Sequence, residues 1–97
     1  MNQIIKIESE KLIERKLGIE VKKLGGMSIK LLSTITGLPD RLCLLPKGRL
    51  FFAELKTTKQ KPTKIQLAIH QRLIRLGFDV YVIDSSEKLK NIILNYE

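Results

Sequence analysis

Two acidic residues and one lysine occupy positions from which they can act together. Asp40 follows a Gly-x-Pro turn at residues 37–39, and Glu54 and Lys56 lie two residues apart in an alternating apolar run. Side chains two apart on a strand point to the same face, so Glu54 and Lys56 should project together. The alternate side chains should point into the core, namely Phe51, Ala53 and Leu55.

These three residue types suit metal-assisted hydrolysis. Carboxylate and carbonyl oxygens are the ligands that Mg²⁺ prefers. Two neighbouring carboxylates raise each other's pKa unless a cation compensates, so Asp40 and Glu54 have a physical reason to hold a metal ion. Lys56 beside them would orient or deprotonate an attacking water.

Each of these residues also has a purely structural interpretation. Asp40 after proline is a common turn residue, and Glu54 with Lys56 would make an ordinary ion pair on a solvated strand face. Together, however, such explanations leave unexplained why an acid, a second acid and a base fall in this order near adjacent strand ends. The pattern therefore favours a functional site over three separate structural roles.

Composition indicates one globular domain spanning residues 1–97. The chain has 97 residues, of which 43% are hydrophobic, and it contains one cysteine. No apolar run approaches the ~20 residues of a membrane-spanning helix, and no signal sequence opens the chain, so we expect a cytoplasmic protein with no membrane partner. A lone Cys43 excludes an intramolecular disulfide and a thiolate zinc site, and we interpret it as a small core residue.

The charge balance points to a polyanion. Eighteen basic residues against ten acidic ones give a net charge of +8. Nucleic acid is the first expectation for so basic a small domain, with a merely solubilising surface as the alternative. The candidates for phosphate contacts follow Glu54 along the chain: Lys59, Lys61, Lys64, Arg72 and Arg75.

Hydrophobic periodicity predicts the elements that must position these residues. A helix is expected over 7–24, with Ser9 and Glu10 as its start signal. Thr63 and Gln66 form a capping box at the start of a second helix, on which Ile65, Ile69, Leu73 and Leu76 line one face. A last helix follows a cap at Asp84, Ser85 or Ser86.

Four strands are expected, at residues 27–33, 41–45, 50–56 and 78–83. A hairpin turn at 46–49 joins the second and third, and the short links between the first three predict an antiparallel meander. The order is α-β-β-β-α-β-α, which indicates an α/β fold with a mixed central sheet flanked by helices.

Two polar residues on the second helix remain open to interpretation. The capping box accounts fully for Gln66, although that role is compatible with one in a site. His70 has no histidine or acid at metal-ligand spacing, so we interpret it as structural or surface-exposed.

In combination, these features resemble a known family. Glu14 on the first helix, Gly-x-Pro-Asp at 37–40, Glu-Leu-Lys at 54–56 and Gln66 opening the next helix resemble a VRR-NUC domain. This is the virus-type replication-repair nuclease branch of the PD-(D/E)XK superfamily. The similarity covers nearly the whole chain, roughly residues 10 to 84.

The resemblance implies roles for these residues in cleavage that depends on Mg²⁺ or Mn²⁺. Asp40 and Glu54 would be metal-ligating carboxylates, with the Leu55 carbonyl as a third oxygen ligand. Lys56 would position the water and stabilise charge on the scissile phosphate. Two further positions would complete the site: a helix acid, for which we take Glu14 with Glu10 as the alternative, and Gln66.

The resemblance also implies a substrate and an assembly. Stand-alone, phage-type members of this size act on branched DNA such as four-way junctions or flaps, as homodimers, so a phage- or bacterium-encoded endonuclease is expected. A C₂ dimer would supply the two sites that symmetric cuts require. Two other functions remain open: a non-catalytic nucleic-acid-binding module, and a nuclease of the same fold that cuts plain duplex DNA.

Overall fold

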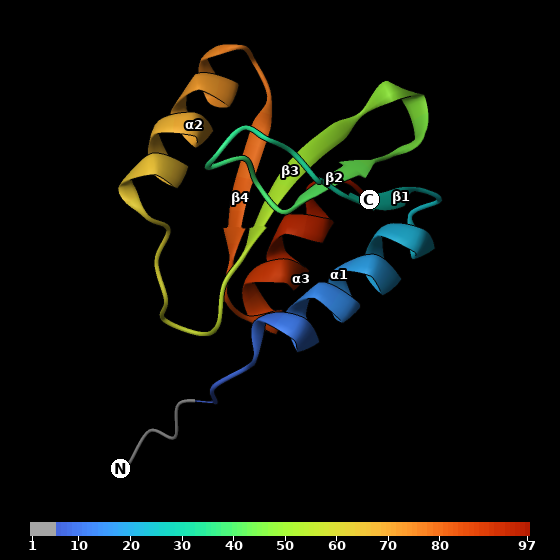
Figure 1. Ribbon diagram of the computed structural model, residues 1–97. Coiled ribbons are helices and arrows are strands. Elements are labelled where there is room, and N and C mark those ends of the chain that lie inside the picture. Colours follow the sequence, from blue (N-terminus) through green and yellow to red (C-terminus); the bar gives the residue numbers. More distant parts are fainter. Residues whose placement is uncertain (1–5) are drawn as a thin grey trace.

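The computed structural model describes residues 6–97, so residues 1–5 of the predicted domain 1–97 lie outside the described part (Figure 1). The order of elements agrees with the prediction: α1 (Glu10–Lys23), β1 (Met27–Lys30), β2 (Arg41–Leu44), a 3₁₀ turn η1 (Pro46–Gly48), β3 (Leu50–Leu55), α2 (Lys64–Arg75), β4 (Asp79–Ile83) and α3 (Ser86–Leu94).

The four strands form one mixed sheet in the order β1-β2-β3-β4. The first three are antiparallel neighbours, which confirms the meander, and β4 returns parallel to β3 after α2. Arg41 of β2 faces Ala53 of β3 in the register. The residues one step further along, Asp40 and Glu54, are therefore brought to the same end of the sheet.

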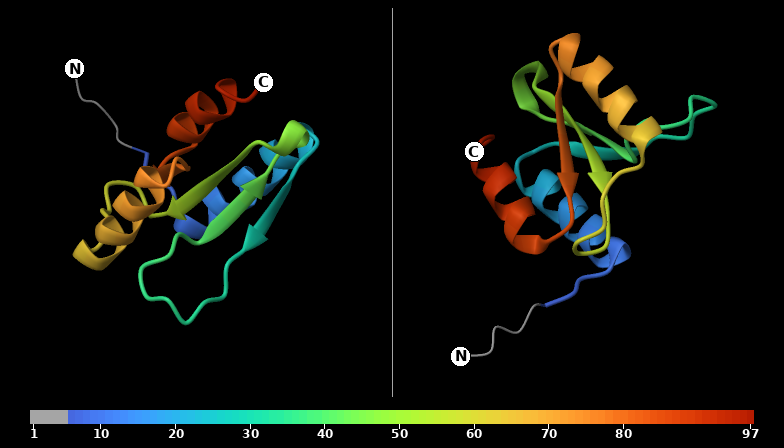
Figure 2. Two further views of the ribbon diagram at one scale, coloured as in Figure 1. Left: turned by 90° about the horizontal axis from the view of Figure 1, so that it is seen from above. Right: turned by 90° about the vertical axis from the view of Figure 1, so that its left-hand side faces the viewer.

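The main core lies between one face of the sheet and the pair α1 and α3, as the two views of Figure 2 show. The alternate residues of β3 enter this core as predicted, and Cys43 joins them. The largest contributions from the helices come from Ile13, Leu17, Val21, Leu89, Ile92 and Ile93.

Polar side chains start all three helices. The Ser9 hydroxyl accepts the Leu12 N–H at 3.1 Å, and the Ser85 hydroxyl accepts the Lys88 N–H at 3.1 Å. Ser85 is therefore the N-cap among the three alternatives for α3. Thr63 caps α2 in the predicted capping box. Each such cap contributes ~1 kcal/mol by satisfying a backbone N–H that the helix leaves unpaired.

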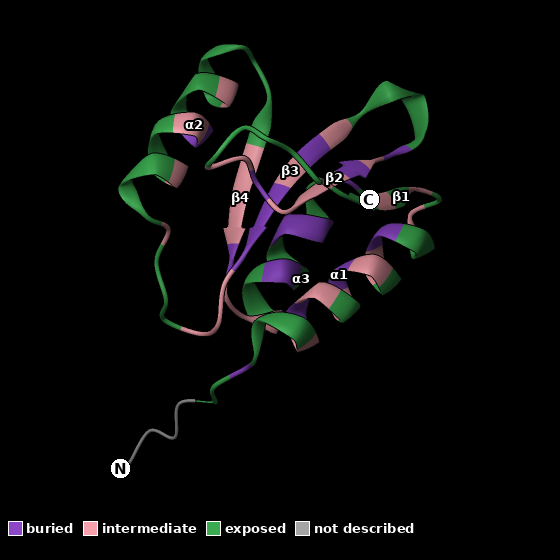
Figure 3. Cartoon of the chain, in the orientation of Figure 1, coloured by how far each residue is buried: buried purple, intermediate pink, exposed green. Residues whose placement is uncertain are grey.

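Helix α2 lies on the other face of the sheet, beside β4, and covers it only partly (Figures 1 and 3). Two residues of its predicted apolar face are exposed, Ile65 by 57% and Leu76 by 72%. The residue of α2 that is buried is His70. The apolar periodicity of this helix thus predicts its existence but not a packed interface along its whole length.

The loop between β1 and β2 packs against the start of α2 through Gly37. Its φ is +94°, and a Cβ there would lie 2.9 Å from both the side chain and the carbonyl oxygen of Ile65. Glycine is therefore required by the backbone conformation and by the close approach. This contact holds the Gly-x-Pro turn next to α2 and delivers Asp40 to the end of β2.

Strand β1 ends at Lys30, three residues before the predicted end at 33. The Leu31 N–H still donates to the Asp40 carbonyl at 2.9 Å, after which the chain leaves the sheet. Among the described residues, no helix is long and apolar enough to cross a membrane.

Candidate functional site

Glu54 is the centre of a polar cluster on the α2 side of the sheet. Its side chain is almost fully buried, with the residue 1% exposed. One carboxylate oxygen, Oε2, accepts a hydrogen bond from Gln66 Nε2 at 3.2 Å and lies 3.5 Å from Lys56 Nζ. Glu54 and Lys56 therefore do share a face, as their spacing predicted.

The second carboxylate oxygen of Glu54 is not satisfied. Oε1 has no hydrogen-bond partner within residues 6–97, and neither does His70 Nε2, which faces it at 3.6 Å. A buried polar atom without a partner costs about 1–3 kcal/mol, so two such atoms facing each other point to a role other than stability.

Burial and, second to it, the negative charge of Asp40 raise the pKa of Glu54 to about 7, while Lys56 acts in the opposite direction. The cause is physical: the ionised form loses hydration and is repelled by a second carboxylate. A cation placed between the two acids would relieve both penalties.

Asp40 is fixed by the backbone of the neighbouring strand. Its Oδ2 accepts the Leu55 N–H at 2.8 Å. This bond joins the end of the Gly-x-Pro turn to the end of β3 and holds the Asp40 carboxyl beside Glu54. Asp40 is thus more than a turn residue, since its side chain bonds across to another strand.

Gln66 performs two tasks with one side chain. Its Oε1 accepts the Thr63 N–H at 2.9 Å, which completes the capping box, while its Nε2 donates to Glu54. The helix cap therefore also orients the amide toward the carboxylate. The capping role of Gln66 is confirmed, and its contact with Glu54 is compatible with a role in the site, which stays a prediction.

His70 is the site residue that sequence reasoning missed. It is 3% exposed and lies one helical turn after Gln66, so both side chains face Glu54. Burial lowers its pKa, which favours the neutral imidazole. The spacing of four residues between Gln66 and His70 could have revealed this, because side chains at positions i and i+4 lie on the same face of a helix. Metal-ligand spacing does not reveal it, since glutamine is a neutral residue.

The two candidate helix acids lie apart from Glu54. Glu10 and Glu14 line a pocket of about 400 Å³ that also contains Asp40. Glu14 Oε2 accepts from Arg41 Nε at 3.2 Å, so its carboxylate is held by a cation on β2. The structure thus brings together Asp40, Glu54, Lys56 and Gln66, with Glu14 and Glu10 beside Asp40 in the adjoining pocket.

The donor set fits a hard divalent cation. Residues 6–97 contain no group of three or more His, Cys, Asp or Glu side chains arranged as a complete metal site. Mg²⁺ does not need one, because it is commonly held by one or two carboxylates and completes its shell with water and phosphate. The unsatisfied Oε1 of Glu54 is the observation that fits a bound divalent cation.

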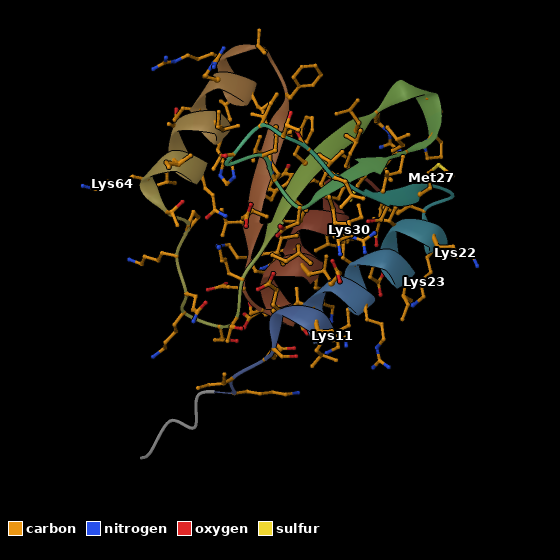
Figure 4. All side chains as sticks on the ribbon, viewed as in Figure 1. Lys11, Lys22, Lys23, Met27, Lys30 and Lys64 are labelled. Atoms are coloured by element: carbon orange, nitrogen blue, oxygen red, sulfur yellow. The ribbon has the colours of Figure 1, made fainter. Side chains whose placement is uncertain are left out.

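The predicted phosphate contacts all lie on the surface. The side chains concerned are exposed, and Figure 4 shows Lys64 at the outer side of the start of α2. Lys59 has a positive φ of 71°, and its N–H donates to Asp84 Oδ2 at 3.2 Å, which shapes the loop after β3. Contacts with DNA stay a prediction for five residues, namely Lys59, Lys61, Lys64, Arg72 and Arg75.

Comparisons with known proteins agree with this geometry. Over 76 residues the chain is 46% identical to "Putative nuclease p44" of Acyrthosiphon pisum secondary endosymbiont phage 1, which covers 77% of this chain and 82% of that protein. No family model matches the sequence.

The solved structures supply the family. A structure described as "VRR_NUC domain" superposes with a TM-score of 0.86 at 29% identity, covering 93% of this chain and 100% of that one. The predicted fold class, with its mixed sheet and flanking helices, is thereby confirmed. By its fold and its relative, this chain belongs to the VRR-NUC nuclease family.

Proposed function

We propose that this protein is a metal-dependent endodeoxyribonuclease that hydrolyses phosphodiester bonds in branched DNA such as four-way junctions or flaps. The observation that carries the proposal is Glu54. The fold buries this carboxylate beside Asp40, and one of its oxygens has no hydrogen-bond partner among the residues that the structure describes. Such an arrangement costs stability and is found where a ligand is to be held.

In this proposal Asp40, Glu54 and the Leu55 carbonyl hold Mg²⁺ or Mn²⁺. A bound divalent ion lowers the pKa of water and offsets the negative charge that develops on the phosphate. Asp40 and Glu54 lie on neighbouring strand ends whose spacing is fixed by the bond from the Leu55 N–H to Asp40. The carboxylates are therefore preorganised before any ligand arrives.

Lys56 has the position of the residue that handles the nucleophile. Its side chain is 16% exposed and its ammonium lies 3.5 Å from Glu54 Oε2. It can therefore orient a water beside the carboxylate and place positive charge next to a scissile phosphate. Gln66 holds Glu54 in place, and Glu14 borders the site from the pocket beside Asp40.

Charge and composition support recognition of DNA by its backbone and shape, as the proposed branched substrate requires. Its net charge is +8, its basic side chains are spread over the surface, and only 5% of its residues are aromatic. Backbone contacts and DNA shape suit such a surface better than base stacking. Two copies related by a two-fold axis would present two sites to a symmetric junction.

The runner-up is a basic module that binds nucleic acid without cutting it. Such a module gains nothing from a buried carboxylate next to a second one, because both repel phosphate. Since Glu54 is held in this costly position by Gln66, the geometry favours a nuclease. The choice between branched and duplex DNA is left to experiment.

Cleavage assays test the proposal directly. Labelled four-way junction, flap and duplex are incubated with Mg²⁺, Mn²⁺ or EDTA, comparing the wild type with Glu54→Gln. An exposed acid at the start of α3, Glu87→Gln, is the matched control. We expect metal-dependent cutting of a branched substrate that only Glu54→Gln abolishes. Binding without cutting under every metal would support the module instead.

Sedimentation velocity tests the homodimer separately. Several large apolar side chains are exposed on the loop after β1 and at the start of α2, namely Leu32, Ile35 and Ile65. Exposed apolar groups of this kind are available to a second copy. We expect a sedimentation coefficient of a dimer at micromolar concentration, and a monomer across that range would remove the dimer from the proposal.

A further inference from the structure

A hollow on the surface lies between α1 and the edge strand β1. It has a volume of about 940 Å³, and its lining includes Glu14 and Arg41. It shares Lys11 and Glu14 with the smaller pocket that contains Asp40. The two hollows therefore adjoin each other at α1, and the smaller one borders the candidate site through Asp40.

Cations follow this groove along α1. Lys11, Arg15 and Lys22 line it and are exposed. Their spacing of four and seven residues places them on one face of the helix. From Lys11 to Lys22 the helix rises ~17 Å, which matches about five nucleotide steps of ~3.4 Å along one DNA strand.

These three cations are not used by the fold. No acidic group in the part of the chain that is described lies within 4.0 Å of Lys11, Arg15 or Lys22. Arg41, by contrast, is paired with Glu14. Figure 4 shows Lys11 and Lys22 towards opposite ends of α1, with Met27 and Lys30 on the neighbouring strand β1.

Small residues keep the groove open. Gly18 lies on its α1 side, and a Cβ added there would meet nothing within 4 Å. Gly26 and Ser28 contribute to the β1 side. Because β1 is the edge of the sheet, no further strand covers this side.

We propose that the groove between α1 and β1 binds the phosphate backbone of the DNA strand that enters the site. This inference rests on the proposed nuclease function and adds a surface that neither the sequence pattern nor the predicted contacts at 59–75 include. Three cations without an ion-pair partner among residues 6–97 complement a polyanion, and the adjoining pocket contains Asp40. The strand runs along α1, past Glu14, to the buried carboxylate.

Gly18 offers a sharp test because it faces open space within a helix. Gly18→Glu places a negative charge in the middle of the groove, whereas Gly18→Ala adds only a methyl group and favours the helix. Binding of a fluorescent four-way junction is measured by anisotropy in EDTA, so that cutting plays no part. We expect Gly18→Glu to bind at least about 10-fold more weakly than Gly18→Ala, with equal or higher thermal stability than wild type for Gly18→Ala.

Charge removal tests the same surface by salt dependence. The triple variant Lys11→Gln, Arg15→Gln, Lys22→Gln is compared with a control that removes three exposed lysines elsewhere, Lys47, Lys88 and Lys90. Each lost phosphate contact lowers the slope of log K against log salt by about 1. We expect a reduction of about 3 in the groove variant and less than about 1 in the control.

The outcomes separate this inference from the nuclease itself. If Gly18→Glu binds as tightly as Gly18→Ala, or the two triple variants lose affinity equally, the groove is not the DNA path even if the wild type cuts. If groove variants lose binding while the wild type cuts nothing, the groove stands and the nuclease proposal fails. A wild type that does not bind DNA overturns both.

Discussion

Glu8 and Glu54 are both buried carboxylates, 6% and 1% exposed, and the fold surrounds them differently. Glu8 Oε1 accepts the Ser86 N–H at 2.7 Å, and its Oε2 accepts from the Ser86 hydroxyl and from Lys16 Nζ at 3.3 Å. Both of its oxygens are satisfied. Within residues 6–97, Glu54 has hydrogen-bond partners on Oε2 alone.

Their pKa values move in opposite directions for this reason. The Ser86 hydrogen bonds and Lys16 lower the pKa of Glu8 to about 2, whereas burial and the nearby Asp40 raise that of Glu54 to about 7. Glu8 ties the N-terminal segment to α3 and to Thr58 in the loop after β3. A satisfied carboxylate serves the fold, while an incompletely satisfied one is available to a ligand.

Replacing Glu54 should separate activity from stability most clearly. Glu54→Gln keeps the shape but removes the charge that would hold a cation, so we expect cleavage to fall by roughly 1000-fold or more. The metal-free variant should be more stable than wild type above pH 7, by about 2 kcal/mol, since an ionised buried group is lost. Urea unfolding in EDTA measures this, and a destabilised variant would contradict the comparison.

Glu54 and Glu8 should change the free energy of unfolding in opposite directions as pH rises. The folded pKa of Glu54, about 7, lies above the ordinary value of 4.5 expected in the unfolded chain, so its contribution to stability is present below pH 4.5 and is lost as pH rises through 7. For Glu8, at about 2, the contribution is present above 4.5 and is lost as pH falls through 2. The total change in the Glu54 contribution over this range amounts to about 3 kcal/mol.

Denaturant unfolding across pH in EDTA checks these slopes one at a time. Glu54→Gln should flatten the curve between pH 4.5 and 7, and Glu8→Gln should flatten it between 2 and 4.5. If either variant retained the wild-type slope in its window, another group would be responsible for it.

Glu8→Gln should weaken the fold without touching the chemistry. Hydrogen bonds to a charged group contribute about 1.5–3 kcal/mol, so we expect a loss of about 2 kcal/mol in the free energy of unfolding. Cleavage per folded molecule at 25 °C should stay within about two-fold of wild type, because Glu8 belongs to the link with Ser86 rather than to the site. If the fully folded variant lost most of its activity, Glu8 would have to be part of the catalytic site.

His70 offers the smallest and most specific change. His70→Leu removes a buried polar group that lies 3.6 Å from Glu54 Oε1. We expect Mn²⁺ affinity, measured by calorimetry, to fall by about 10-fold, as for other groups that orient a metal ligand. His70→Gln, which keeps an N–H at a similar reach, should restore most of it. Equal affinities for both variants would make His70 a packing residue.

Local patterns predicted much of the site. Strand alternation placed Glu54 and Lys56 on one face, the capping box positioned Gln66, and Gly-x-Pro-Asp located the turn that delivers Asp40. These patterns are reliable because each depends on backbone geometry over a few residues. The order of elements followed from the same periodicities.

Burial of polar groups could not be predicted in that way. His70 was assigned to structure or surface, yet it faces Glu54 from one turn beyond Gln66. The apolar face of α2 is partly exposed. Glu14 forms an ion pair with Arg41, which lies 27 residues away in the sequence. Each of these depends on where a helix docks against the sheet.

The amino-acid sequence therefore specifies the elements and the faces of the strands and helices, because steric and hydrogen-bonding preferences act between near neighbours. The contrast between Glu8 and Glu54 arises only when distant segments meet, since Glu8 is satisfied by Ser86, 78 residues away. Whether a buried carboxylate is satisfied depends on the complete set of groups packed around it. That set exists only in the folded chain.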